Sequence, residues 1–106
     1  MRFAEKVYVL CKKIPKGKIT TYGAIAKALN SSPRAVGQAL RCNPYAPIVP
    51  CHRVIMSDGS IGGFNGKIKG HEIKRKIALL SREGVKITGN KVLNLGQVIV
   101  QDFSDK

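Results

Sequence analysis

Two stripes of hydrophobic residues near the start of the chain predict helices. The first stripe has members three or four positions apart: Phe3, Val7, Leu10, Cys11 and Ile14. This spacing predicts an amphipathic helix that ends before Pro15. After a turn, Thr20 or Thr21 can cap a second helix, whose buried side begins at Ile25.

A third helix is predicted to begin at Ser32 and Pro33 and to end near Arg41. Serine is a favourable N-cap, and proline suits the first helical position because no amide donor is needed there. The apolar side of this helix consists of Val36, Ala39 and Leu40. Its other side consists of Arg34, Gly37, Gln38 and Arg41. Two short helices with a tight link, at about 21–41, are typical of a helix-turn-helix, although an ordinary bundle gives the same pattern.

The second half of the chain predicts one more helix and a hairpin. Apolar spacing favours a helix over residues 70–83, ended by Gly84. We expect its inward side chains to be Ile73, Ile77 and Leu80, and its outward ones to be Lys74, Arg75, Lys76 and Arg82. Alternating residues on both sides of Gly89 and Asn90 predict a β-hairpin.

Candidate chemistry gathers at residues 50–54, where a thiol, an imidazole and a guanidinium are adjacent. Three prolines stiffen the approach: Pro44, Pro47 and Pro50. Because proline removes amide donors, this approach is neither helix nor central strand. Cationic or proton-accepting neighbours lower the pKa of a thiol from about 8.5 and favour the nucleophilic thiolate. The alternative is that Cys51 is a small buried hydrophobe and His52 a core histidine.

An extended chain would separate the thiol from the imidazole. Adjacent residues then point to opposite faces, so His52 would act on Cys51 through a water unless the chain turns. Such a relay requires a carboxylate behind the imidazole to hold its tautomer. Among only six acidic residues, Glu83 stands at a helix C-terminus, where the dipole disfavours a carboxylate by roughly 0.3–1 kcal/mol. Glu83 is therefore either solvated or paired with a cation.

The predicted fold class is mainly α, in one domain that covers residues 1–106. It is a winged-helix-like helix-turn-helix bundle of about four helices. An irregular active-site loop occupies 43–66, and a small C-terminal β-hairpin and tail occupy 85–106.

The charge balance indicates a polyanionic partner. The net charge is +13, from 19 Lys and Arg against six Asp and Glu, which favours nucleic acid or an anionic membrane surface over a basic surface that only confers solubility. No apolar run could span a bilayer, and the N-terminus has no signal-peptide core. We therefore expect a soluble, cytoplasmic protein. Three cysteines at unrelated spacings argue against a disulfide framework and a zinc site.

The order of these residues resembles one known family. The chain is similar to the C-terminal domain of the O6-alkylguanine-DNA alkyltransferases, also called methylated-DNA–protein-cysteine methyltransferases. The matching segments are 34–37, 41–44, 50–54, 62–64 and 83–84. The resemblance runs from about residue 3 to 85, and the Pro-Cys-His-Arg-Val run is its most specific part. We expect this domain to stand alone, without the family's usual N-terminal domain.

The resemblance implies a role for each site residue. Cys51 would be the alkyl acceptor, with His52 acting through a water as its base and Glu83 behind His52. Asn43 is similar to the hinge asparagine that ties the helix-turn-helix to the active-site segment. The implied catalytic residues are therefore Cys51, His52, Glu83 and Asn43.

The resemblance also implies contacts with the substrate. Arg34 resembles the arginine that fills the space of a flipped nucleotide, and Tyr22 resembles the tyrosine that helps rotate that nucleotide. The recognition helix would enter the minor groove, which suits Gly37, and Phe64 replaces a tyrosine common in the family. The implied substrate and DNA contacts are Tyr22, Arg34, Gly37, Arg41, Arg53, Val54, Phe64 and Asn65.

The implied reaction is DNA repair by base flipping. A lesion on guanine O6 lies inside the duplex, so the nucleotide must leave the stack before a thiolate can attack the alkyl carbon. The product is an S-alkylcysteine, so each protein would act once. The partner would be double-stranded DNA carrying O6-alkylguanine, and we expect a monomer that needs no metal and no organic cofactor.

Three other functions remain as alternatives. Alkyltransferase-like proteins bind alkylated DNA without catalysis and recruit other repair factors, but they have tryptophan or alanine where this chain has Cys51. A transcription factor would aim Asn, Gln or Arg at base edges, and the third helix offers only Arg34, Gln38 and Arg41. A Cys-His hydrolase is compatible with the spacing but does not suit the net charge of +13.

Overall fold

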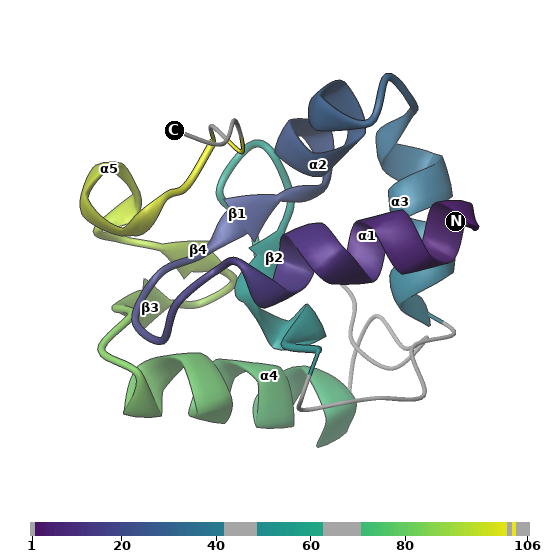
Figure 1. Ribbon diagram of the computed structural model, residues 1–106. Coiled ribbons are helices and arrows are strands. Elements are labelled where there is room, and N and C mark those ends of the chain that lie inside the picture. Colours follow the sequence, from purple (N-terminus) through teal and green to yellow (C-terminus); the bar gives the residue numbers. More distant parts are fainter. Residues whose placement is uncertain (1, 42–48, 63–70, 102, 104–106) are drawn as a thin grey trace.

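The computed structural model describes residues 2–41, 49–62, 71–101 and 103. Its elements in chain order are α1 (Phe3–Lys12), β1 (Thr20–Thr21), α2 (Tyr22–Ala28), α3 (Pro33–Arg41), η1 (Cys51–Arg53), β2 (Val54–Ile55), α4 (His71–Arg82), β3 (Ile87–Thr88), β4 (Lys91–Val92) and α5 (Leu95–Val98) (Figure 1). Here η1 is a single 3-10 turn. The predicted mainly α fold with a small C-terminal hairpin is confirmed.

Side-chain caps begin both helices of the helix-turn-helix, as the sequence predicts. Thr21 Oγ1 accepts a hydrogen bond from Ala24 N at 3.0 Å at the start of α2. Ser32 Oγ accepts one from Ala35 N at 3.2 Å at the start of α3. Between the two helices, Asn30 has a φ of 55°, a left-handed conformation that asparagine adopts more readily than most residues. The link between α2 and α3 is therefore set by local hydrogen bonding.

The first three helices pack together around an apolar centre. In Figure 1, α1 lies against α3, and α2 packs against both. The buried residues of α1 are Val7, Leu10 and Cys11, and those of α3 are Val36, Ala39 and Leu40. These are the apolar stripes that helical spacing predicts, so the outer side of α3 is left free for another role.

A short parallel strand pair joins the start of α2 to η1. In this pair Thr20 lies opposite Val54, and Thr21 lies opposite Ile55. Tyr22, the first residue of α2, is thereby held in fixed register with η1. The sequence analysis missed both strands, because two residues are too few to show an alternating pattern.

The buried side of α4 includes a lysine, which contradicts the sequence prediction. Ile73 and Leu80 are buried and Ile77 is half-buried, but Lys76 is 0% exposed. Lys76 follows Ile73 by three positions and precedes Leu80 by four, so helical periodicity places it on the apolar stripe. The prediction of an outward Lys76 is wrong because it followed the charge of the residue instead of its position.

The predicted C-terminal hairpin is confirmed. β3 and β4 pair antiparallel, with Ile87 opposite Val92 and Thr88 opposite Lys91. Gly89 in the turn has a φ of 59°, which a glycine adopts without strain. Across the described ranges, no helix is both long enough and apolar enough to cross a membrane.

Candidate active site and nucleic-acid interface

The residues of η1 turn the chain sharply at the cysteine. Cys51 N donates a hydrogen bond to Val49 O at 2.8 Å, and the Val54 N–H closes the turn on Cys51 O. Because the chain turns here, the opposite-face argument for an extended strand does not apply to Cys51 and His52. The two residues are 7% and 4% exposed, respectively. Both residues are therefore buried at this turn.

Glu83 binds the two residues that follow the cysteine. His52 Nε2 lies 3.1 Å from Glu83 Oε2. Arg53 forms a bidentate pair with the same carboxylate: Nε donates to Oε1 at 2.8 Å and Nη2 donates to Oε2 at 2.7 Å. The remaining Arg53 nitrogen, Nη1, donates to Ile14 O at 2.8 Å. Glu83 at the end of α4 is thus a paired carboxylate and not a solvated one, because a bidentate arginine offsets the helix dipole.

The burial and the partners of these groups determine their charge. Burial lowers the pKa of His52, and the hydrogen bond and charge of Glu83 offset only part of this effect. Burial raises the pKa of the Glu83 carboxyl, but hydrogen bonds from Arg53 and His52 outweigh it and hold that pKa below its usual value. Near neutral pH the site therefore contains a carboxylate beside a neutral imidazole.

This charge state assigns the tautomer of His52. A neutral imidazole carries one ring proton, and the contact between Nε2 and an ionised carboxylate places that proton on Nε2. Nδ1 then has a free lone pair and can accept a proton from Cys51, directly or through a water. Chemically, such residues can supply a nucleophile, a general base and a carboxylate that orients the base.

The Tyr22 side chain lies close to Gly62, at the beginning of the glycine-rich segment. A Cβ placed on Gly62 would lie 3.5 Å from Tyr22 Cε2 and 3.2 Å from Met56 Cγ, so these side chains approach the backbone closely. Burial raises the pKa of Tyr22 to about 12, with Cys51 adding to the effect. The phenol therefore remains protonated and can donate a hydrogen bond. Val54 is fully buried, and its contact with a substrate stays a prediction.

The outer side of α3 has the character of a nucleic-acid interface. Arg34, Gln38 and Arg41 are exposed there. A Cβ placed on Gly37 would meet no heavy atom within 4 Å, so the backbone at this point is open to a ligand. The side chains offer positive charge around an approachable backbone, as phosphate binding requires.

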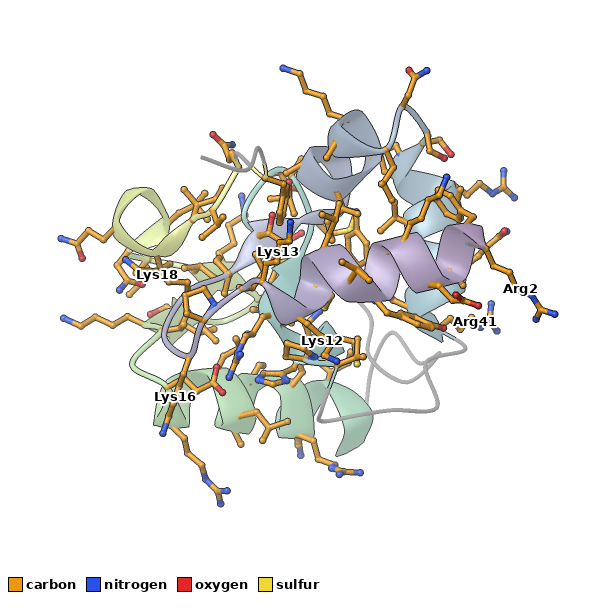
Figure 2. All side chains as sticks on the ribbon, viewed as in Figure 1. Arg2, Lys12, Lys13, Lys16, Lys18 and Arg41 are labelled. Atoms are coloured by element: carbon orange, nitrogen blue, oxygen red, sulfur yellow. The ribbon has the colours of Figure 1, made fainter. Side chains whose placement is uncertain are left out.

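Basic side chains also extend over a second part of the surface. Figure 2 shows Arg2 and Arg41 at one end of the molecule and Lys16 and Lys18 at the other. Lys18 Nζ donates to Gln97 O at 2.9 Å, which attaches the turn after α1 to α5. Positive charge is therefore not confined to α3 but also occurs on the turn after α1.

Three of the predicted site residues lie outside the described residues: Asn43, Phe64 and Asn65. Among the placed ones, His52 follows Cys51 in η1 and contacts Glu83, whereas Arg34 and Arg41 lie on the exposed side of α3. Arg53 faces Glu83, and its contact with DNA stays a prediction.

Sequence reasoning missed one buried charged residue. Lys76 Nζ donates to the carbonyl oxygens of Val54 and Ile61, each at 2.7 Å, and lies 5.9 Å from the centroid of the Tyr22 ring. Its position between Ile73 and Leu80 on one helical stripe was the signal that could have found it.

Together the fold and the site define a class of domain in which a helix-turn-helix is joined to a buried cysteine followed by a histidine–glutamate pair. Residues 2–85 match the family described as 6-O-methylguanine DNA methyltransferase, DNA binding domain. The chain belongs to this family, and the resemblance inferred from the sequence is confirmed.

Curated relatives carry the corresponding name. The methylated-DNA–protein-cysteine methyltransferase of Thermococcus sibiricus is 53% identical over 85 residues, which are 79% of this chain and 45% of that protein. The protein of the same name from Saccharolobus islandicus is 52% identical, over 80% of this chain and 52% of its own length. The chain therefore spans about half the length of the curated relatives it matches.

Solved structures of two kinds are similar to this one. The O6-methylguanine-DNA methyltransferase of Pyrococcus kodakaraensis has a TM-score of 0.68 and 49% identity, covering 80% of this chain and 47% of that one. Mycobacterium tuberculosis OGT in complex with DNA has a TM-score of 0.69 and 41% identity, covering 78% and 50%. S. pombe Atl1, in complex with damaged DNA containing O6-carboxymethylguanine, has a TM-score of 0.76 and 35% identity, covering 96% and 100%.

Proposed function

We propose that this protein repairs O6-alkylguanine in double-stranded DNA by transferring the alkyl group to its own Cys51. The observation that carries the proposal is the buried Cys51 next to His52, whose Nε2 lies 3.1 Å from the Glu83 carboxylate. This set supplies a nucleophile, a base and an orienting group. Relatives named methylated-DNA–protein-cysteine methyltransferase support the same chemistry.

The transfer is a direct displacement at the alkyl carbon. The thiol of Cys51 passes its proton toward Nδ1 of His52, and Glu83 stabilises the imidazolium that forms. A bond forms between sulfur and the alkyl carbon as the bond between that carbon and O6 breaks. The electron pair of the broken bond stays on the guanine, toward which Tyr22 can donate a hydrogen bond, and the guanine takes up a proton from water while the imidazolium of His52 returns its proton to water. A thioether does not hydrolyse readily, so each molecule acts once.

The exposed side of α3 would hold the duplex while the damaged nucleotide leaves the stack. Arg34 would fill the gap, and Gly37 would let the backbone enter the minor groove. The DNA complexes of the Mycobacterium tuberculosis and S. pombe relatives support duplex DNA as the partner. Roles for Asn43 and for Phe64 and Asn65 in the base pocket belong to this proposal, as do action as a monomer and a cytoplasmic location.

A second candidate is a sensor that binds the lesion without reacting. It is favoured by the similarity to S. pombe Atl1, because this chain covers 100% of that one with a TM-score of 0.76. A sensor has no need for an oriented base next to a thiol. The ordered His52–Glu83 pair behind Cys51 therefore favours the transferase.

An intact-mass measurement distinguishes these two functions. The protein is incubated with a duplex that contains one O6-methylguanine, and we expect a mass gain of one methyl group that peptide mapping assigns to Cys51. Cys51→Ala should bind the same duplex and gain no mass, and an unmethylated duplex should leave the parent protein unchanged. Lesion binding by the parent protein without any mass gain would overturn the transferase proposal in favour of the sensor.

A further inference from the structure

A second basic surface lies at the turn between α1 and β1. Its exposed members are Lys12 at the end of α1, Lys16 and Lys18 in the turn, and Lys86 after α4. We call these four residues the turn surface. Figure 2 shows Lys16 and Lys18 at the opposite end of the molecule from Arg41, the last residue of α3. The turn surface is therefore separate from the outer side of α3.

Contacts on both sides hold this turn in place. Gly17 has a φ of 88° and packs so closely against the end of α4 that an added Cβ would lie 3.1 Å from Glu83 O. On the other side, Lys18 Nζ donates to Gln97 O in α5 at 2.9 Å. Lys86 follows Glu83 by three residues, so segments that are distant in sequence bring their lysines to the same end of the molecule.

The positive charge of the turn surface is not neutralised by the acids that the structure places. Glu83 adjoins the turn, but Arg53 donates to both oxygens of its carboxylate. Within the described ranges, the other acidic side chains whose surroundings are known are Glu5, in the first turn of α1, and Asp58, which accepts two hydrogen bonds from its own loop. Four cations are therefore gathered around a carboxylate that is already paired.

Stabilisation of a helix end explains only one of these lysines. Lys12 lies in the last turn of α1, where a cation interacts favourably with the helix dipole. Lys16 and Lys18 lie outside any helix, and Lys86 lies beyond the glycine that ends α4. Like charges that are held together repel one another, and a bound polyanion removes that repulsion.

The chemistry of the turn surface fits the phosphate backbone of DNA. A duplex presents one negative charge for about every 1.7 Å of its axis, and lysines contact phosphates without reading bases. A membrane surface would also require several apolar side chains that insert between the lipids. Among the described residues, the large exposed apolar side chain that adjoins this surface is Leu93, whose N–H donates to Lys86 O. One leucine provides little insertion, so we favour DNA.

We propose that the turn surface binds the backbone of a second DNA segment while α3 holds the first. The longest dimension of the molecule is 35 Å, and DNA is stiff over this length because its persistence length is about 150 bp. A duplex on α3 would have to bend sharply to reach the turn, so the second contact belongs to another duplex or to a distant part of the same one. Alkyl transfer does not require this contact, which instead allows the protein to pass from one segment to another.

Matched variants separate the turn surface from the net charge. The turn variant combines Lys12→Ala, Lys16→Ala and Lys86→Ala, and it retains Lys18 because that ammonium bonds to α5. The control variant changes the net charge equally but removes exposed lysines from α1, α2 and α4 at other positions: Lys6→Ala, Lys27→Ala and Lys74→Ala.

The first test counts duplexes in each complex by native mass spectrometry with short undamaged DNA. We expect complexes of one protein with two duplexes for the parent and for the control variant. The turn variant should retain one duplex and lose the second. A parent protein that binds only one duplex, or that holds two only as a protein dimer, would overturn the proposal. Equal loss of the second duplex in both variants would overturn it as well.

The second test measures how salt affects the second binding step. Each phosphate contact of a lysine adds about one to the slope of log affinity against log salt concentration. The turn variant should therefore show a slope shallower by about three and at least a tenfold weaker second step, and changing the DNA sequence should have no effect. Vesicles containing phosphatidylserine provide the comparison. Parent binding to these vesicles that the turn variant lacks, with one duplex per protein, would overturn the proposal in favour of a membrane surface.

Failure of this proposal is distinguishable from failure of the proposed function. The turn variant should transfer the methyl group from O6-methylguanine in a duplex at the parent rate under single-turnover conditions, because its substitutions lie outside the reacting residues. If the parent protein transfers no methyl group, the transferase proposal fails, but the number of bound duplexes still decides the role of the turn surface.

Discussion

The buried cluster at η1 and the outer side of α3 are built in opposite ways. At η1, the side chains of His52, Arg53 and Glu83 are joined by hydrogen bonds of 2.7–3.1 Å. On α3, Arg34 and Arg41 extend into solvent around an open glycine. The first region fixes each charge in one place, whereas the second leaves its charges free to adjust.

The reaction in the buried cluster and the binding of DNA by α3 therefore depend on solvent in different ways. Within the cluster, burial shifts pKa values and makes each hydrogen bond matter, so loss of one group leaves another unsatisfied. On α3, water and salt screen the charges, so each contributes little alone and several act together. Reaction and DNA binding should therefore respond to different perturbations.

A change in salt concentration should give the largest difference between duplex binding by α3 and reaction in the buried cluster. Raising the salt concentration from about 50 to about 200 mM should weaken duplex binding about 10³-fold if roughly six phosphates are contacted. The rate of transfer from free O6-methylguanine should hardly change, because no phosphate is involved. Fluorescence anisotropy with damaged and undamaged duplexes of several sequences provides the affinities. Salt-insensitive, sequence-selective binding to undamaged DNA would instead favour a transcription factor.

Acid should destabilise the protein through the buried cluster. The pKa of Glu83 is lowered in the folded state, so its contribution is present above the unfolded value of about 4.3 and is lost as pH falls through the folded value. We expect Glu83→Gln to lower the free energy of unfolding by about 2 kcal/mol at pH 7, with the difference disappearing in acid. Urea denaturation at several pH values measures this difference. Glu5→Gln, at an exposed position on α1, should show no comparable loss, and an equal loss in both variants would refute a specific role for the cluster.

Arg34 should affect extrusion of the nucleotide more than chemistry. We expect Arg34→Ala to reduce the rate of repair of duplex DNA about tenfold, since base flipping costs a few kcal/mol and the arginine offsets part of it. Transfer from free O6-methylguanine should keep its rate. Single-turnover assays on both substrates make the comparison, with Arg82→Ala as a variant that removes an exposed charge from α4. Equal losses on both substrates would remove Arg34 from the flipping role.

Local signals explain what could be predicted from the sequence. The starts of α2 and α3 depend on Thr21 and Ser32, which cap residues three positions later. The hairpin turn depends on Gly89, which is close in sequence to both strands. Such features are decided by neighbours along the chain, so residue type and spacing suffice.

Contacts between distant segments explain what was missed. The pairing of Thr20 with Val54 involves two residues on each side and joins separate parts of the chain. Lys76 was predicted to point outward because of its charge, although its spacing placed it on the apolar stripe. Its partners, Val54 O and Ile61 O, are backbone atoms that no residue pattern shows. The resemblance to the family paired Glu83 with His52, but the hydrogen bonds from Arg53 to both oxygens of Glu83 became visible only in the structure.

The pH dependence of the single-turnover rate tests the central claim most directly. If His52, oriented by Glu83, takes the proton of the Cys51 thiol during the reaction, the parent protein should keep its rate below the free-thiol pKa of about 8.5, down to the pH at which His52 becomes protonated. Glu83→Gln should bind the methylated duplex equally well but transfer the methyl group more slowly across the pH range in which His52 is neutral, because a neutral amide cannot stabilise the imidazolium that forms. An unchanged profile in Glu83→Gln would contradict the relay and leave Glu83 as a partner of Arg53 alone.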